Sequence, residues 1–197
     1  MNKLKILVEG YARPGPNNTY LASPTCSLIY HNDLKILVDP GTNKEKLLNA
    51  LAKEDLKPDD IDILFLSHYH PDHFLNLKLF PNNDLYDGSM LWKDEAEIAY
   101  SNKLPGTEIQ IIPTPGHAAE QASLLFGEDT LGTVCIAQDV FWWEDGKQDT
   151  SSLEVLMNLH DPFASDVEAL KESRKKVLEI ADWIVPGHGK AFKPPEK

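Results

Sequence analysis

The sequence lacks the features that mark several specialised classes of protein. It has only two cysteines among 197 residues, too few for the disulfide framework of a small secreted scaffold. It has no apolar run that approaches the roughly 18 residues of a transmembrane helix. It also has no internal repeat and no low-complexity segment. A collagen, a coiled coil, a membrane protein and a disordered tail are therefore excluded.

Basic residues are also scarce. Lys and Arg together number 19 against 31 Asp and Glu, which gives a formal net charge of −12. A surface this acidic repels phosphate backbones and disfavours nucleic acid as a partner. A single small site is less constrained, because a bound metal ion can invert the charge around it.

Two further absences bear on the compartment. Residues 1–10 do not have the pattern of a signal peptide. Cys26 and Cys135 lie in apolar runs, as expected for buried thiols in a reducing compartment. We therefore expect a cytoplasmic protein, a monomer or a homodimer, that acts on a small molecule and has no membrane partner.

The rest of the composition, with 42% apolar and 25% charged residues, is that of an ordinary globular protein, and we expect one domain over residues 1–197. Capping-box spacings predict a helix after Thr42 and a longer one after Ser165. A further helix is expected near 94–100, and the Pro-, Gly- and Asn-rich stretch 10–24 predicts a loop. Apolar runs predict strands at 4–8, 26–30, 34–38, 61–66, 108–112, 122–126, 133–137 and 183–185. The pattern indicates an α/β protein.

Four metal-binding residue types crowd into the six residues that follow the run 61–66. They are His68, His70, Asp72 and His73. The end of a strand is a common place for a site, because the strand fixes the backbone and the loop frees the side chains. Imidazole nitrogen and carboxylate oxygen are ligands that Zn²⁺ prefers. The cluster therefore predicts a metal site.

Three isolated residues extend this set. His117, Asp139 and His188 each come shortly after a predicted strand and lie beside turn-forming or apolar residues. Singly, each would be as consistent with a structural role as with ligation. Together with the cluster they make seven candidate ligands from four strand ends, which suggests two ions rather than one.

The order HxHxDH, then His, Asp and His, resembles the metallo-β-lactamase-fold hydrolases from about Cys26 to Gly189. The resemblance implies an αβ/βα sandwich in which two mixed sheets face each other, helices lie outside, and metals lie at one edge. It also implies that Asp39 orients the ligand loop. The ligand sets it implies are His68, His70 and His117 for one ion, Asp72, His73 and His188 for the other, and Asp139 as the bridge.

The chemistry that follows from this resemblance is hydrolysis at a dinuclear centre with a metal-bridging hydroxide. Asp72 is the candidate for moving the proton, although it could equally be a ligand without that role. The donor set favours two Zn²⁺ ions, with Fe²⁺ or Mn²⁺ as alternatives. The sequence is also similar to the redox flavodiiron proteins, but these carry Glu at the position of His70, so hydrolysis is favoured over oxygen reduction.

The substrate is less constrained. We expect a small ester, thioester or lactone, because a bare catalytic core suffices for it. Residues 131–141 and 173–188 resemble the subfamily of metallo-β-lactamase domain-containing protein 1, which implies phosphodiester cleavage of RNA or single-stranded DNA as the alternative. A metal-binding scaffold without catalysis is a third hypothesis. Two departures from the family pattern, Ala118 after the lone His and Gln138 before the lone Asp, lie beside the expected metals.

Four more residues have two interpretations each. Trp142 and Trp143 follow Asp139, so either ring could line the site or pack in the core. Tyr69 is expected to point away from the metals if its neighbours bind them. His160 could reach the cleft or lie at the surface before a helix.

Overall fold

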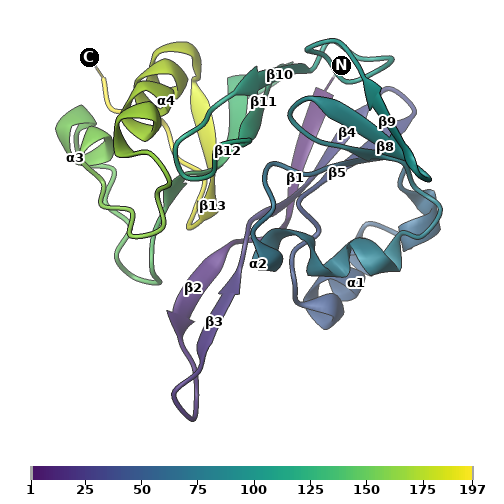
Figure 1. Cartoon of the computed structure of the whole chain (residues 1–197), viewed down its shortest axis with the longest axis horizontal. Helices are drawn as coiled ribbons and strands as arrows, with labels where there is room; N and C mark the ends of the chain where they lie inside the picture. The colour runs from purple at the N-terminus through teal and green to yellow at the C-terminus, as the bar shows by residue number, and fades with distance from the viewer. Residues whose placement is uncertain (1, 197) are drawn as a thin grey trace.

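The computed structural model describes residues 2–196, and its strands form two main sheets that face each other (Figure 1). In spatial order the first sheet holds β1 (Asn2–Val8), β4 (Cys26–His31), β5 (Leu34–Val38), β6 (Ile63–Phe65), β7 (Leu85–Tyr86), β8 (Met90–Lys93) and β9 (Ala96–Ala99). The second sheet holds β10 (Gln110–Pro113), β11 (Ala122–Glu128), β12 (Gly132–Trp142) and β13 (Trp183–His188).

The helices lie outside the sheets. They are α1 (Lys44–Lys53), η1 (Pro58–Asp60), α2 (Pro71–Phe74), η2 (Leu75–Leu79), α3 (Leu153–Met157) and α4 (Val167–Ile180). In Figure 1, α3 and α4 cover the second sheet at the left, and α1 lies on the side of the first sheet. Within residues 2–196, every helix is too short or too polar to cross a membrane.

Alternation along β5 shows why the first sheet is buried on both faces. Ile36 and Val38 belong to the hydrophobic cluster between the two sheets, whereas Leu37 packs in a second cluster with Leu47 and Leu51 of α1. Successive side chains of a strand point to opposite faces, so a continuous apolar run fits a strand covered on both sides.

The same alternation occurs on β12. Val134 and Ile136 pack between the sheets, and Cys135 joins a third cluster with Leu170 and Val177 of α4. The layers are therefore helix, sheet, sheet and helix, which confirms the αβ/βα sandwich expected from the sequence.

Strand directions bring the candidate ligands to one edge of the sandwich. β10 and β12 both pair antiparallel with β11, and β13 runs parallel to β12, so the carboxyl ends of β10, β12 and β13 share an edge. Backbone hydrogen bonds join the two sheets there, from Ala122 N to Ser67 O (3.0 Å) and from Thr25 N to Gly187 O (2.6 Å). The edge that carries the candidate ligands is thus fixed by main-chain contacts.

The loop predicted at 10–24 is instead a projecting hairpin of β2 (Tyr11–Pro14) and β3 (Tyr20–Ser23) (Figure 1). Its turn contains Asn17 and Asn18 at φ values of 54° and 59°. Asn tolerates this left-handed conformation better than most residues do. The polar residues that suggested a loop therefore form the turn, and the residues flanking them pair.

The helix predicted near 94–100 is also wrong, because β8 and β9 form a hairpin there. Asp94 adopts a φ of 51° between the two strands, which ends any helix. The other two helices form, but each N-cap lies one residue later than predicted, at Asn43 and at Asp166. Side-chain oxygens of these residues accept the first free backbone N–H groups, as a cap does.

We predict that Leu124→Ala lowers the free energy of unfolding by about 2–5 kcal/mol, because Leu124 is fully buried between the sheets and its truncation leaves a cavity. Leu21→Ala on β3 is the matched control, since Leu21 is 40% exposed and its loss should cost within about 0.5 kcal/mol. Urea unfolding in the presence of a chelator measures both values without a contribution from metal binding. Equal losses would contradict the assignment of the core.

Candidate metal centre

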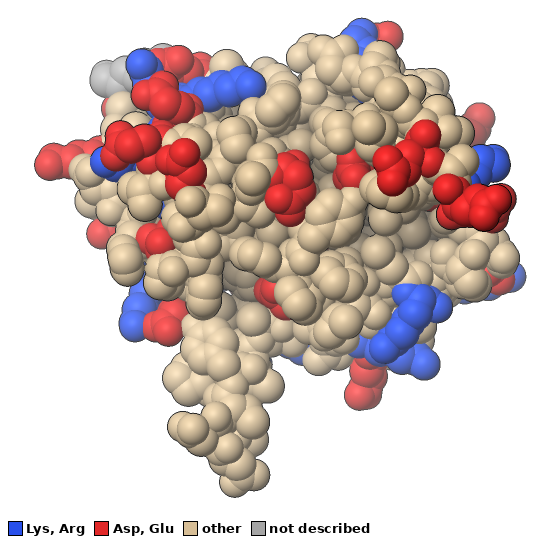
Figure 2. Space-filling view, viewed as in Figure 1, with Lys and Arg blue, Asp and Glu red and all other residues tan. Residues whose placement is uncertain are grey.

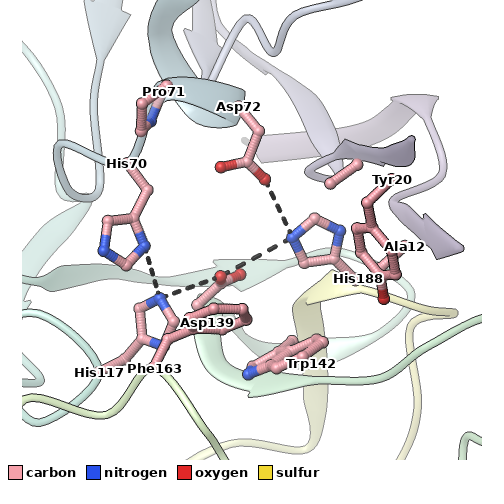
Figure 3. A pocket seen from close by; sticks show the side chains of 11 residues that line it. Ala12, Tyr20, His70, Pro71, Asp72, His117, Asp139, Trp142, Phe163 and His188 are labelled. Atoms are coloured by element: carbon pink, nitrogen blue, oxygen red, sulfur yellow. Dashed lines mark hydrogen bonds and ion pairs between the residues drawn. The ribbon is translucent and has the colours of Figure 1, made fainter. Parts of the chain in front are cut away.

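The seven residues that the sequence singled out lie together where the two sheets meet, and five of them are labelled in Figure 3. Each offers one nitrogen or oxygen atom within 4.8 Å of the others in its group. The groups are His68, His70, His117 and Asp139, and next to them Asp72, His73 and His188. A third overlapping group joins His68 and His73 to Asp39.

The ligand loop begins directly after β6. His70 is the N-cap of α2 and Pro71 is its first residue, where the fixed φ of proline favours a helix start. The helix then places Asp72 and His73 in its first turn. His68 and His70 precede the helix on an irregular backbone, so four side chains from six residues converge from different directions.

An irregularity in β12 sets the direction in which the Asp139 side chain points. The register with β13 shifts on both sides of Gln138, and Gln138 adopts a φ of 48°. A bulge of this kind redirects the following side chain. A positive φ at this position suits glycine better than a residue with a side chain, and Gln138 offsets the strain by donating from Nε2 to Thr25 O (3.0 Å). Gly187 is needed beside it, because a Cβ at that position would overlap Asp139 Oδ1.

Asp39 fixes one side of the centre, as the resemblance implied. Its Oδ2 accepts a hydrogen bond from His73 Nδ1 (2.6 Å), and its two oxygens accept from the backbone N (2.8 Å) and hydroxyl (2.6 Å) of Ser67. The Ser67 hydroxyl in turn lies 3.0 Å from His68 Nδ1. One carboxylate therefore sets the ring orientations of two histidines, whose Nε2 atoms face the centre.

Two other histidines are held in the same manner by other parts of the chain. His117 Nδ1 donates to Asp161 Oδ2 (2.7 Å), and His188 Nδ1 donates to the Tyr11 carbonyl on β2 (3.0 Å). His70 differs, since its Nδ1 faces the centre and lies 2.8 Å from His117 Nε2. Asp161 was missed by the sequence analysis, because no spacing connects it with a histidine 44 positions earlier.

Buried polar atoms in the centre lack partners within the described chain. His68 Nε2, His73 Nε2 and Asp139 Oδ1 are buried and make no hydrogen bond. Buried polar atoms are almost always paired, because leaving one unpaired costs free energy. Divalent cations coordinated by these atoms would satisfy all three, so the donor set fits metal ions of the kind that imidazole and carboxylate bind.

The charges in the metal-free centre balance each other. Burial lowers the pKa of His73, but Asp139 and Asp39 raise it well above its ordinary value, and Asp139 likewise raises the pKa of His188 against burial. Burial raises the pKa of Asp139, yet the charges of His73 and His188 hold it well below its ordinary range. Burial and the neighbouring histidines lower the pKa of His68. The site therefore favours positive charge at His73 and His188, which is the kind of charge that a metal ion would supply.

A cavity of about 340 Å³ opens above the centre. Five candidate ligands form its floor, and the remaining lining residues are Ala12, Tyr20, Ala22, Pro71, Trp142 and Phe163. Figure 3 shows Trp142 and Phe163 on one side of the centre and Ala12 and Tyr20, from the projecting hairpin, beside His188. Within the described residues the lining contains no Lys or Arg.

The structure decides between the two interpretations of each of the four remaining residues. Trp142 lines the cavity with its ring 5.7 Å from that of Phe163. Trp143 is buried in the cluster beneath α4 and packs there. Tyr69 points away and donates its hydroxyl proton to Asp87. His160 is exposed and does not line this cavity, whereas the residue after it orients His117.

Comparisons with known proteins agree with this arrangement. A family model described as the metallo-beta-lactamase superfamily matches residues 19–188. Metallo-beta-lactamase domain-containing protein 1 of Xenopus laevis is 30% identical over 98% of this chain and 82% of its own length. The human protein of the same name is 33% identical over 80% of this chain, but that match spans only 59% of the human protein. A shorter match, 29% identical over 39% of this chain and 30% of the other, is to the exodeoxyribonuclease WalJ of Streptococcus pneumoniae.

Solved structures show the same fold. A Thermotoga maritima protein described as a metallo-beta-lactamase superimposes with a TM-score of 0.74 at 23% identity, covering 98% of this chain and 99% of the other. AidC, described as a dizinc quorum-quenching lactonase, has a TM-score of 0.64 at 18% identity over 91% of this chain and 82% of its own. The family match over most of the sequence and the relative that aligns along nearly all of it lead to one conclusion: the chain belongs to the metallo-beta-lactamase superfamily of metal-dependent hydrolases.

Proposed function

We propose that the protein hydrolyses a small, uncharged ester, thioester or lactone that carries an apolar group. The lining of the 340 Å³ cavity supports this most directly. Beyond the candidate ligands its side chains are apolar or aromatic, and no Lys or Arg among the described residues lines it. Away from the proposed metal ions, a charged carboxylate or phosphate group would find no Lys or Arg to pair with, whereas an acyl chain would find apolar walls.

We further propose two metal sites. His68, His70 and His117 would hold one ion, and Asp72, His73 and His188 the other. Asp139 lies between the groups, with Oδ2 3.3 Å from His117 Nε2 and Oδ1 3.5 Å from His73 Nε2, as a bridging carboxylate must. Zn²⁺ suits these donors best, with Fe²⁺ or Mn²⁺ as alternatives. When bound, two such ions supply an activated water and an electrophile that stabilises the developing negative charge.

Asp72 is suited to move the proton. Its Oδ2 lies 3.3 Å from His188 Nε2 at the edge of the cavity. Burial raises the pKa of this carboxyl, but the hydrogen bond with His188 and the charge of His73 hold the pKa below its ordinary value. An ionised carboxylate in this place can accept a proton as the nucleophile attacks and return it to the leaving group.

The aromatic side chains would place the apolar part of the substrate. Trp142 and Phe163 form one wall, and Tyr20 with Ala12 forms the other. Phe163 is 61% exposed in the absence of a ligand, an unusual state for a large apolar ring. An acyl chain seated between these walls would cover the ring and exclude water from the reacting carbonyl.

Cleavage of RNA or single-stranded DNA is the second candidate, and the similarity to WalJ favours it. That match covers only 39% of the chain. The net charge of −12 opposes it, and in Figure 2 acidic side chains lie across the middle of the face while basic ones lie toward its margins. A phosphate backbone would meet repulsion on approach and, beyond the proposed metal ions, no Lys or Arg among the described residues of the cavity lining.

We predict that a substrate panel separates the two candidates. Purified protein loaded with Zn²⁺ should hydrolyse uncharged lactones, thioesters and p-nitrophenyl esters faster than bis-p-nitrophenyl phosphate or a short RNA. Within an ester series, kcat/KM should rise as the acyl chain lengthens, because each added methylene buries more apolar surface. RNA cleavage that outpaces every small ester would contradict the proposal, and inactivity of the loaded protein on all of them would favour a scaffold.

A substitution of Phe163 tests whether the aromatic side of the cavity binds the acyl chain. Phe163→Ser should raise KM for the longer acyl esters and leave the acetate ester little changed, because only a long chain would reach the exposed ring. Leu21→Ser is the matched control, since Leu21 is an exposed apolar residue that does not line the cavity. An equal effect of Phe163→Ser on short and long esters would exclude this wall as the acyl site.

We predict that Asp139→Asn removes the second ion and most of the activity. The amide keeps the shape of the carboxylate but lacks the charge that would balance two dications. Turnover should fall by several orders of magnitude, as expected when a site that generates the nucleophile is lost. Folding should persist, because the three histidines of the first site remain. Metal stoichiometry measured beside kcat gives the answer, and two retained ions with near-normal turnover would rule out a bridging role.

We predict that Zn²⁺ binding releases protons at neutral pH. Against the opposing effect of burial, Asp139 raises the pKa values of both His73 and His188 above the ordinary value, so an ion that binds their nitrogen atoms must displace the protons that these side chains hold. Apparent affinity should therefore rise as pH increases through these raised pKa values and fall below them. Calorimetric titrations at one pH in buffers of different ionisation enthalpy count the protons. Binding enthalpies that do not depend on the buffer would contradict the prediction.

A further inference from the structure

The first three turns of α4 contact the segments that carry His117, Asp139 and Asp161. Helix α4 lies outside the second sheet (Figure 1), and the residues of its outer face are exposed. Two adjacent residues, Ser173 and Arg174, are nevertheless buried and polar, with exposed fractions of 4% and 2%. Neither lines the cavity above the metal centre, and the proposed reaction does not use them.

Ser173 holds the loop that leads to His117. Its hydroxyl donates to the Pro115 carbonyl at 2.6 Å. The next carbonyl, of Gly116, accepts from the backbone N of Asp166 at the start of α4 (2.9 Å). Gly116 itself has a φ of 131°, and a Cβ there would overlap the backbone of Leu170. The loop before His117 therefore packs directly against α4, and a side chain larger than hydrogen at Gly116 would push the two apart.

Arg174 connects two other segments. Its Nε donates to the Val140 carbonyl at 3.0 Å, and its Nη1 donates to the Leu159 carbonyl at 2.6 Å. Val140 follows Asp139 in β12, and Leu159 lies two residues before Asp161, which orients His117. The guanidinium of Arg174 therefore sets the distance between β12, which carries Asp139, and the loop that carries Asp161. Asp161 is the residue that accepts the hydrogen bond from His117.

Burying the Arg174 guanidinium costs free energy of desolvation, which its hydrogen bonds must offset. Burial lowers the pKa of its guanidinium to about 10, against the charge of Asp161, so the side chain remains a cation at neutral pH. Its Nη2 has no hydrogen-bond partner within the described residues. An apolar side chain would fill this place beneath α4 at lower cost. Only arginine offers two donors at a fixed angle to two separate carbonyls.

We propose that Ser173 and Arg174 are positioning residues that hold the His117–Asp161 pair and the Asp139 segment in register for metal binding. The proposal rests on the metal sites proposed above. Removing the guanidinium frees the Leu159 and Val140 carbonyls, so Asp161 loses its fixed place and His117 loses the partner that orients its ring. Loss of an orienting partner of a metal-binding histidine typically weakens metal binding about 10–100-fold.

The test compares Arg174→Met, Arg174→Lys and Ser173→Ala with Lys175→Met, a control that removes an exposed cation from the same turn of α4. Three measurements are made for each variant. In metal-free protein labelled with ¹⁵N-histidine, NMR observes the buried His117 Nδ1–H that donates to Asp161. Chelator competition then measures the dissociation constants for Zn²⁺, and urea unfolding of the metal-free protein reports stability.

We expect Arg174→Met to lose or broaden the His117 Nδ1–H signal and to weaken Zn²⁺ binding about 10–100-fold. Arg174→Lys should recover part of both effects, because an ammonium can donate to one or both carbonyls without the fixed fork. Ser173→Ala should weaken binding less, and Lys175→Met should match the unmodified protein. Should Arg174→Met fail to fold, Arg174→Lys and Ser173→Ala decide by the NMR and Zn²⁺-binding measurements.

A retained His117 signal with Zn²⁺ dissociation constants within twofold of the unmodified protein would overturn the proposal, even if stability fell. A purely structural role would lower the urea midpoint and leave both other readouts unchanged. Failure of the proposed metal sites looks different, because the unmodified protein would then bind no Zn²⁺ while its NMR signal persisted, and failure of the proposed hydrolysis alone would leave Zn²⁺ binding and the NMR signal of the unmodified protein intact. The NMR comparison between Arg174→Met and Lys175→Met still tests the positioning contact in that case.

Discussion

A buried carboxylate without a Lys or Arg partner is the constraint around which the centre is built. Asp139 has a side chain only 5% exposed, and its charged partners among the described residues are His73, His117 and His188. A carboxylate in this setting would be expensive unless positive charge surrounds it. Three features of the fold accommodate this carboxylate. They are the bulge at Gln138, the absence of a side chain at Gly187 and the convergence of three histidines.

The histidines can supply that charge in two forms. When protonated, His73 and His188 supply it: against the opposing effect of burial, Asp139 raises the pKa of each imidazole, and the two imidazoles lower the pKa of its carboxyl. Metal ions would replace these protons with larger charges at the same nitrogen atoms. Because the outer ring nitrogens of His73, His117 and His188 already have hydrogen-bond partners, the rings would not need to turn for ions to bind at the inner nitrogens. The protein therefore holds the centre in advance of its ligand.

The convergence of the candidate ligands was predictable from the sequence, because each lies at or shortly after an apolar run long enough to identify a buried strand. The two hairpins were not, since pairing is a contact between segments and their turns depend on left-handed Asn17, Asn18 and Asp94. Trp142 and Trp143 could not be separated either. Adjacent strand residues point to opposite faces, and the irregular register after Gln138 decides which ring meets the cavity.

Asp161 illustrates a different limit. It lies in a loop before α4, and only the packing of that helix against β12 brings it to His117. On the opposite side of the centre, the projecting hairpin supplies the Tyr11 carbonyl that orients His188 and also the Tyr20 wall of the cavity. Segments from the two halves of the chain thus orient the rings, while loops that follow strands, the helix α2 and the strands β12 and β13 supply the candidate ligands. Since the hairpin both orients a candidate ligand and forms a wall of the cavity, a change in its position would alter metal geometry and substrate fit together.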